Sequence, residues 1–153
     1  MGWKTFFKTG NIVNPQFSYH VVPFVIDKFD SYTFDNNPTE FWVVCTDIIT
    51  GKPAYHRMDA FTHRELEWMR ASASMPAVSR PVFLDGRVML DGGITDSIPL
   101  QAFQNLGYGR NVVILTQPND YFRKTMRIAW LLRYKKKKYP KVGECMARRH
   151  EMY

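Results

Sequence analysis

Residues 41–48, with the sequence Phe-Trp-Val-Val-Cys-Thr-Asp-Ile, form an almost uninterrupted apolar run that limits the fold more than any other segment. A strand whose successive residues are apolar has two apolar faces and is covered on both. Further strands are expected at 53–58, 81–84 and 88–90, and helices at 62–73 and 97–106. Helices that alternate with buried strands predict a layered α/β fold.

Local signals set the ends of these elements. Thr62 and Glu65 have the spacing of a capping box, so a helix is expected to begin there and to end before Pro76. The dipeptide at 85–86, Asp-Gly, predicts a hairpin turn, and Ser97 is expected to cap a helix that stops at Gly107. We expect long loops with short helical pieces at 1–40, and regular elements at three later ranges: a buried strand at 111–116 and helices at 121–134 and 141–152.

The bulk composition narrows the class of protein. The 153 residues fit one domain, and 45% of them are hydrophobic, which is typical of a globular chain. No apolar run approaches the roughly 18 residues of a membrane span, and the first residues do not have the pattern of a signal peptide. The only cysteines, Cys45 and Cys145, are far apart, with Cys45 in an apolar strand. A cytoplasmic protein without disulfides is therefore expected.

The most informative functional signal is Asp91-Gly92-Gly93, which directly follows the predicted strand at 88–90. A carboxylate at the end of a strand, facing the crevice of an α/β sheet, is well placed to act as a general base. The glycines allow positive φ and a close approach of the backbone. The alternative is an ordinary turn, since Asp-Gly is a common turn dipeptide.

Other reactive side chains have simpler interpretations. Ser72 and Ser74 lie on or just after a helix, where they are expected to cap or pack. Asp96 is interpreted as a helix-start acid beside Ser97, with a second site carboxylate as the alternative, and Asp47 as an acceptor for turn amides. The histidines do not have metal-ligand spacing and are interpreted as surface or hydrogen-bonded core groups; they are His20, His56, His63 and His150. No metal or cofactor is expected.

Several motifs together resemble the bacterial patatin-like phospholipase family. From the strand at 41–48 onward, Val-Val-Cys-Thr-Asp at 43–47 followed by Thr-Gly-Lys at 50–52 is similar to a strand and turn of that family. The segment 70–77, Arg-Ala-Ser-Ala-Ser-Met-Pro-Ala, resembles its Ala-Ser-x-x-x-Pro helix end. Asp91-Gly92-Gly93, continued by Ile98-Pro99, resembles its Asp-Gly-Gly motif. The Tyr-Pro at 139–140 and the Arg-His at 149–150 are similar to a basic C-terminal extension in a bacterial subgroup.

The resemblance implies lipid acyl-ester hydrolysis by a Ser–Asp dyad, with Asp91 as the base and Gly92-Gly93 fixing its angle. The family places its nucleophile in Gly-x-Ser-x-Gly and its oxyanion donors in a glycine-rich loop. None of the six serines has those flanking glycines, and no three-glycine run occurs. We therefore expect a fragment that is inactive alone: 1–120 as the C-terminal part of an incomplete three-layer patatin-like α/β core, and 121–153 as a basic helical extension. A sheet that lacks one of its strands exposes an edge and apolar surface. The chain is therefore expected to self-associate or to bind the missing N-terminal half.

The charge distribution offers an alternative function. Residues 1–120 hold 10 Lys/Arg and 12 Asp/Glu, a net charge of −2, whereas residues 121–153 hold 11 and 2, a net charge of +9. This segment includes Lys135, Lys136, Lys137 and Lys138. A non-catalytic module that binds anionic membrane surfaces, at a peripheral position, is the second hypothesis. A solvated charged face is the simpler alternative. Nucleic acid is not expected as a partner, because no binding motif for it is present.

Overall fold

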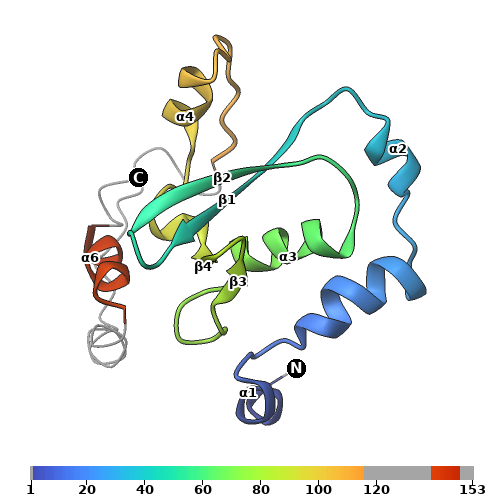
Figure 1. Cartoon of the computed structure of the whole chain (residues 1–153), viewed down its shortest axis with the longest axis vertical. Helices are drawn as coiled ribbons and strands as arrows, with labels where there is room; N and C mark the ends of the chain where they lie inside the picture. The colour runs from blue at the N-terminus through green and yellow to red at the C-terminus, as the bar shows by residue number, and fades with distance from the viewer. Residues whose placement is uncertain (1, 116–138, 149–153) are drawn as a thin grey trace.

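The computed structural model describes residues 2–115 and 139–148 (Figure 1). Their centre is one sheet of four strands, β1 (Phe41–Asp47), β2 (Lys52–Met58), β3 (Val82–Leu84) and β4 (Arg87–Asp91), in the order β2-β1-β4-β3. Every neighbouring pair in this sheet is antiparallel. The chain is thus a mixed α/β structure, and its predicted strands at 41–48, 53–58, 81–84 and 88–90 are confirmed within a residue or two.

Two tight turns set the register of the sheet. The β1–β2 hairpin pairs Asp47 with Lys52 and turns through Gly51, whose φ is +71°. In the β3–β4 hairpin, Asp85 and Gly86 have φ values of +48° and +74°. Two successive positive φ values are typical of a type I′ turn, whose twist matches that of the paired strands. The hairpin predicted from Asp85-Gly86 is therefore confirmed.

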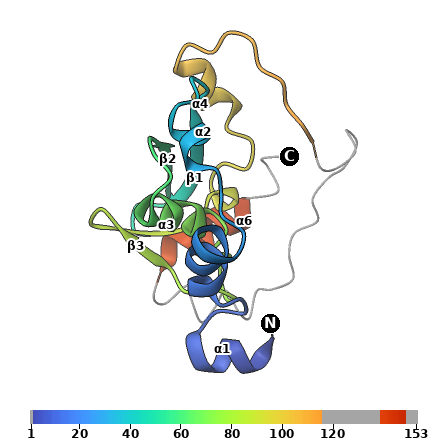
Figure 2. The ribbon, with the colours of Figure 1, turned by 90° about the vertical axis from the view of Figure 1, so that its right-hand side faces the viewer.

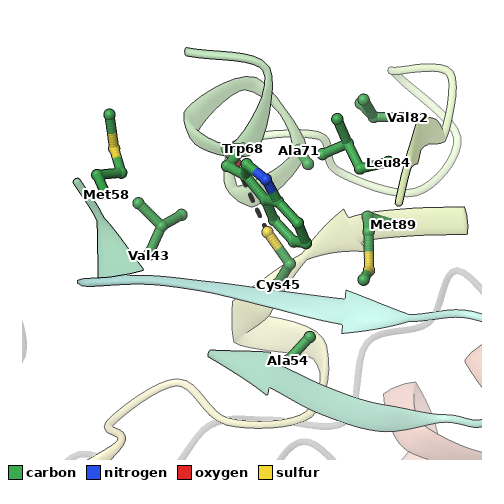
Figure 3. Close-up of a cluster of buried hydrophobic side chains, with 9 residues drawn as sticks. All are labelled: Val43, Cys45, Ala54, Met58, Trp68, Ala71, Val82, Leu84 and Met89. Atoms are coloured by element: carbon green, nitrogen blue, oxygen red, sulfur yellow. Dashed lines mark hydrogen bonds between the residues drawn. The ribbon is translucent and has the colours of Figure 1, made fainter. Parts of the chain in front are cut away.

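Helix α3 (His63–Ser72) covers one face of the sheet. The Thr62 side chain accepts a hydrogen bond from the Glu65 amide, so the predicted helix start is confirmed. The helix buries Trp68 against the sheet, and the Cys45 thiol donates to the Trp68 carbonyl (Figure 3). The core on this face consists of Val43, Cys45, Ala54, Met58, Trp68, Ala71, Val82, Leu84 and Met89. Cys45 is buried and free, as expected.

A second, smaller core lies on the opposite face. Successive residues of a strand point to opposite faces, and Leu90 follows Met89 of the first core. Leu90 packs with Ile48, with Ile94 of the short 3₁₀ helix η2 (Gly92–Ile94), and with Val142 of α6 (Pro140–Arg148). The sheet thus lies between α3 on one side and η2 with α6 on the other. The predicted last helix is confirmed over 140–148; its remainder lies outside the described residues.

The first 40 residues contain more helix than expected. They form α1 (Trp3–Thr9), a π-helical segment η1 (Phe17–Ile26) and α2 (Ser31–Asp35). Asp30 caps α2 by accepting from the Thr33 amide. The segment η1 lies along α3, where the Phe24 ring stacks on His63. This long-range packing supplies the order that the Asn- and Pro-rich sequence did not indicate.

Two predictions downstream of Asp91 need correction. Helix α4 (Leu100–Asn105) exists, but Pro99 stands at its start and Ser97 does not cap it. The buried strand predicted from 111 onward is wrong for 111–115, because these residues pair with no strand. Val112 is 93% exposed and Ile114 is 89% exposed. In Figure 2 this segment lies to one side of the sheet, and no described strand is in position to bond its backbone. Predictions for 116–138 lie outside the described residues.

Candidate active site

Asp91 is the last residue of β4 and the N-cap of η2. Its carboxylate Oδ1 accepts from the Gly93 amide at 2.7 Å. Among the described residues, the second carboxylate oxygen, Oδ2, has no hydrogen-bond donor. An N-cap aspartate uses one oxygen to satisfy a helix amide and leaves the other available. The half-buried Asp91 therefore holds a fixed orientation while keeping one oxygen able to accept a proton.

The backbone of Asp91 is held from both sides. Its amide donates to the carbonyl of Ser74 at 3.0 Å, and its carbonyl accepts from the Thr46 hydroxyl at 2.8 Å. Thr46 is fully buried in β1. These bonds connect the end of β4 to the loop after α3 and to the central strand. The sequence does not predict that Thr46 positions Asp91, because a threonine in an apolar strand gives no local signal for a bond to the Asp91 carbonyl.

Gly92 is required by a close approach and not by its dihedral angles. A Cβ atom at this position would lie 2.2 Å from the Val44 carbonyl oxygen and 2.6 Å from the Val44 carbonyl carbon. Neither Gly92 nor Gly93 has a positive φ. The expectation of positive φ is therefore wrong for both, whereas close backbone approach is confirmed at Gly92. Only the absence of a side chain lets η2 pass directly against β1.

A hollow of about 310 Å³ lies beside the glycine turn. Gly92 and Gly93 form one wall, β1 residues including Val44 form another, and Ser72 at the end of α3 also lines it. The Ser97 hydroxyl, also in the lining, donates to the Gly93 carbonyl at 3.0 Å. The hollow combines an apolar strand surface with polar groups of the turn, a combination common in small-molecule sites.

The remaining acidic and serine candidates have structural partners. Asp96 accepts from the Tyr55 hydroxyl at 2.6 Å, and burial together with Asp96 raises the pKa of Tyr55. Asp96 does not start a helix, so that interpretation is corrected. Asp47 accepts from the amides of 49 and 50, as predicted. The Ser74 hydroxyl is buried and donates to the Arg70 carbonyl, which confirms its packing role.

The histidines pair with acidic groups or aromatic rings. His56 contacts Glu65 at 2.6 Å and stacks on Trp68, and His20 contacts Glu67 at 2.8 Å. This agrees with their interpretation as surface or hydrogen-bonded groups. Over 2–115 and 139–148, no three His, Cys, Asp or Glu side chains are arranged to hold a metal ion. His150 and the lysines at 135–138 lie outside the described residues.

Within the described part of the chain, no helix has both the length and the apolar character needed to cross a bilayer. This finding concerns α1 to α4 and α6, and it does not extend to the range 121–134. The interfacial helix predicted there stays a prediction.

Comparison with known proteins places these features in a family. The family model described as patatin-like phospholipase matches residues 1–103. This match includes the first 40 residues, which the resemblance drawn from motifs did not cover. Uncharacterized NTE family proteins of Mycobacterium bovis and Mycobacterium tuberculosis are each 33% identical over 63 residues. The aligned segment covers 41% of this chain and 16% of the relatives' length. The match over 103 of 153 residues shows that the chain belongs to the patatin-like phospholipase family.

Proposed function

We propose that this chain supplies the base of a Ser–Asp dyad that hydrolyses lipid acyl esters, and that Asp91 is that base. The observation that carries the proposal is the orientation of its carboxylate. Oδ1 is held by the Gly93 amide, so Oδ2 is the oxygen that takes the proton. Family membership supports the reaction class, since the matching model is named for phospholipase activity.

In the proposed reaction, a serine oxygen attacks the ester carbonyl while its proton moves to Asp91. The tetrahedral intermediate expels the alcohol, which takes that proton, and an acyl-serine remains. Water then attacks the acyl-serine, again giving a proton to Asp91, and the serine leaves with that proton as the fatty acid is released. The aspartate ends each cycle ionised, so no further proton carrier is needed.

The nucleophile in this proposal comes from a segment that is not among these 153 residues. The support is the lack of any Gly-x-Ser-x-Gly in the sequence, together with the engagement of Ser74 and Ser97 with backbone carbonyls. Ser72, like Ser97, lines the hollow next to Gly92 and Gly93. It lies at the end of a helix and not at a strand-to-helix elbow, so it does not have the exposed, strained position of such a nucleophile.

Fluorophosphonate labelling of the purified chain, read by intact mass, tests the source of the nucleophile. We expect no adduct. A single adduct that disappears in Ser72→Ala would refute an external nucleophile and make this chain an enzyme by itself. In a complete or reconstituted enzyme that carries the nucleophile segment, Asp91→Asn should abolish ester hydrolysis. Asp59→Asn, at an exposed aspartate of similar shape, is the matched control and should retain it.

The division of the chain belongs to the same proposal. Residues 1–120 are proposed as the C-terminal part of a patatin-like core, and 121–153 as its basic extension. The exposed apolar side chains of Val112 and Ile114 support a protein partner there, either the missing half or a second copy. Analytical ultracentrifugation over a concentration series tests the second copy. Val112→Asp with Ile114→Asp should shift any oligomer toward monomer, and a monomer at all concentrations would leave the missing half as the partner.

The second candidate function is binding to anionic membrane surfaces through the basic segment. The charge asymmetry favours it, since the segment 121–153 carries a net charge of +9. Sedimentation with phosphatidylserine vesicles tests it, and binding should fall steeply as salt rises. Replacement of Lys135, Lys136, Lys137 and Lys138 by Gln should remove most of the binding. Equal affinity for duplex DNA would instead indicate unspecific electrostatics.

A further inference from the structure

A second hollow, of about 580 Å³, lies on the α6 side of the sheet and apart from the glycine turn. One wall is the β1–β2 turn with Thr50 and Lys52. The opposite wall is α6, and Ile94 with Thr95 forms part of the lining between them. Neither Asp91 nor its two glycines line this hollow, so the proposed dyad does not account for it.

Positively charged side chains from both walls surround this hollow. Lys141 and Arg148 are seven residues apart on α6, which places them on one face of the helix, and Lys52 contributes from the opposite wall. Glu144 is the acidic side chain in the lining, and it forms an ion pair with Lys141 at 3.0 Å. Among the described residues, the lining thus holds three cations and one carboxylate. Within the described ranges, Lys52 has no acidic partner, so its charge is available to a ligand.

The walls are fixed in place by buried contacts. Val142, buried between the cationic residues of α6, packs against Ile48, Leu90 and Ile94. The Cys145 thiol donates to the Gly51 carbonyl at 3.3 Å. A Cβ on Gly51 would lie 3.0 Å from the Lys141 Cβ, so helix and turn are in close contact. The cationic side chains thus extend from backbone segments that are fixed in place. This lowers the conformational entropy cost of ordering them around an anion.

The two threonine hydroxyls of the lining differ in whether their proton is free to be donated to a ligand. The Thr46 hydroxyl donates its only proton to the Asp91 carbonyl. In the 2.7 Å contact between the Thr46 and Thr95 hydroxyls, Thr95 must therefore be the donor. The Thr95 proton is therefore already used. The Thr50 oxygen accepts from the Lys52 amide at 3.3 Å, which leaves its proton for a ligand. Three cations and a hydroxyl donor match an anion with several oxygen acceptors.

We propose that this hollow between the β1–β2 turn and α6 binds a phosphate group, held by Lys52, Lys141 and Arg148. The phosphate belongs either to the headgroup of a lipid or to a soluble phosphate ester. A phosphate group offers several oxygen acceptors to these cations and to the Thr50 hydroxyl, and Ile94 and Pro53 offer apolar surface to the rest of the ligand. The site does not depend on the hydrolysis proposed for Asp91, since binding requires no nucleophile.

The test compares Lys52→Gln with Lys28→Gln, which removes the same charge at an exposed position outside the hollow. Calorimetry with inorganic phosphate should show binding by the unaltered chain and a loss of about fivefold in Lys52→Gln, the upper end for one exposed charge pair. Lys52→Arg should restore the affinity and Lys28→Gln should retain it. No binding at millimolar phosphate, or equal loss in both glutamine variants, would overturn the proposal.

Vesicles separate the two sources of the phosphate. The same variants are sedimented with phosphatidylcholine vesicles that contain phosphatidic acid, and circular dichroism confirms that each variant is folded. If Lys52→Gln weakens both phosphate and vesicle binding, the ligand is a lipid headgroup. If it weakens phosphate binding alone, the ligand is a soluble ester. Either result supports the site, whereas vesicle binding that falls equally in Lys28→Gln without an effect on phosphate contradicts it.

Discussion

Gly92→Ala tests whether the glycine turn is held by contact between two backbones. The added Cβ would lie 2.2 Å from the Val44 carbonyl oxygen, 2.6 Å from its carbonyl carbon and 2.9 Å from its Cγ1. Two of these three atoms belong to the backbone of β1, which is paired on both sides by β2 and β4. β1 cannot shift without breaking its backbone hydrogen bonds to the neighbouring strands, so η2 must move instead.

The size of the effect follows from this geometry. Overpacking of a core costs roughly 1–3 kcal/mol when side chains can adjust. Here the obstacle is backbone, so we expect a loss near the top of that range, about 3 kcal/mol in the free energy of unfolding. For a chain of this size, that corresponds to a fall in Tm of roughly 6–12 °C. A loss this large is a substantial part of the stability of a typical domain.

Urea denaturation of the wild-type chain and Gly92→Ala measures the loss. Gly109→Ala is the matched control, because a Cβ there meets no atom within 4 Å. A double variant with Val44→Ala removes the Cγ1 contact but leaves the carbonyl, so it should not recover the lost stability. The reasoning is refuted if Gly92→Ala stays within about 0.5 kcal/mol of the control, the range of an ordinary surface substitution, or if Val44→Ala rescues it.

Three further predictions concern buried or half-buried polar groups. Thr46→Val keeps the side-chain shape but leaves the Asp91 carbonyl without its hydroxyl donor, so the free energy of unfolding should fall by about 1–3 kcal/mol in urea denaturation; no change would show that the hydroxyl bond is dispensable. Burial raises the pKa of the Cys45 thiol to about 12, so iodoacetamide at pH 8 should label Cys145 first, and equal rates would contradict the burial of Cys45. Burial acts to raise the pKa of Glu67, but hydrogen bonds from Arg70 and His20 hold this pKa below its usual value. The stability that this carboxylate adds is therefore present above its unfolded pKa and lost as the pH falls through the folded one, and Glu67→Gln should flatten that acid-side slope in denaturation curves.

Local sequence signals predicted the elements around the candidate site because those elements depend on neighbouring residues. The apolar run at 41–48 predicted β1, and Asp85-Gly86 predicted the turn that leads into β4. Thr62 and Glu65 predicted the start of α3. Each signal acts over a few residues, through side-chain burial, positive φ or a cap, and therefore remains readable without a structure.

Only the tertiary structure decided how Asp91 is held. The Thr46 hydroxyl and the Ser74 carbonyl reach it from 45 and 17 residues away, and no local pattern encodes such distances. The tertiary structure also decided that the apolar segment 111–115, predicted as a strand, does not form one. A strand needs a neighbour's backbone groups as well as its own composition, and within the described residues that neighbour is missing. Sequence thus determined which segments tend to form strands and helices, while long-range contacts decided which of them pair and how the Asp91 backbone is held.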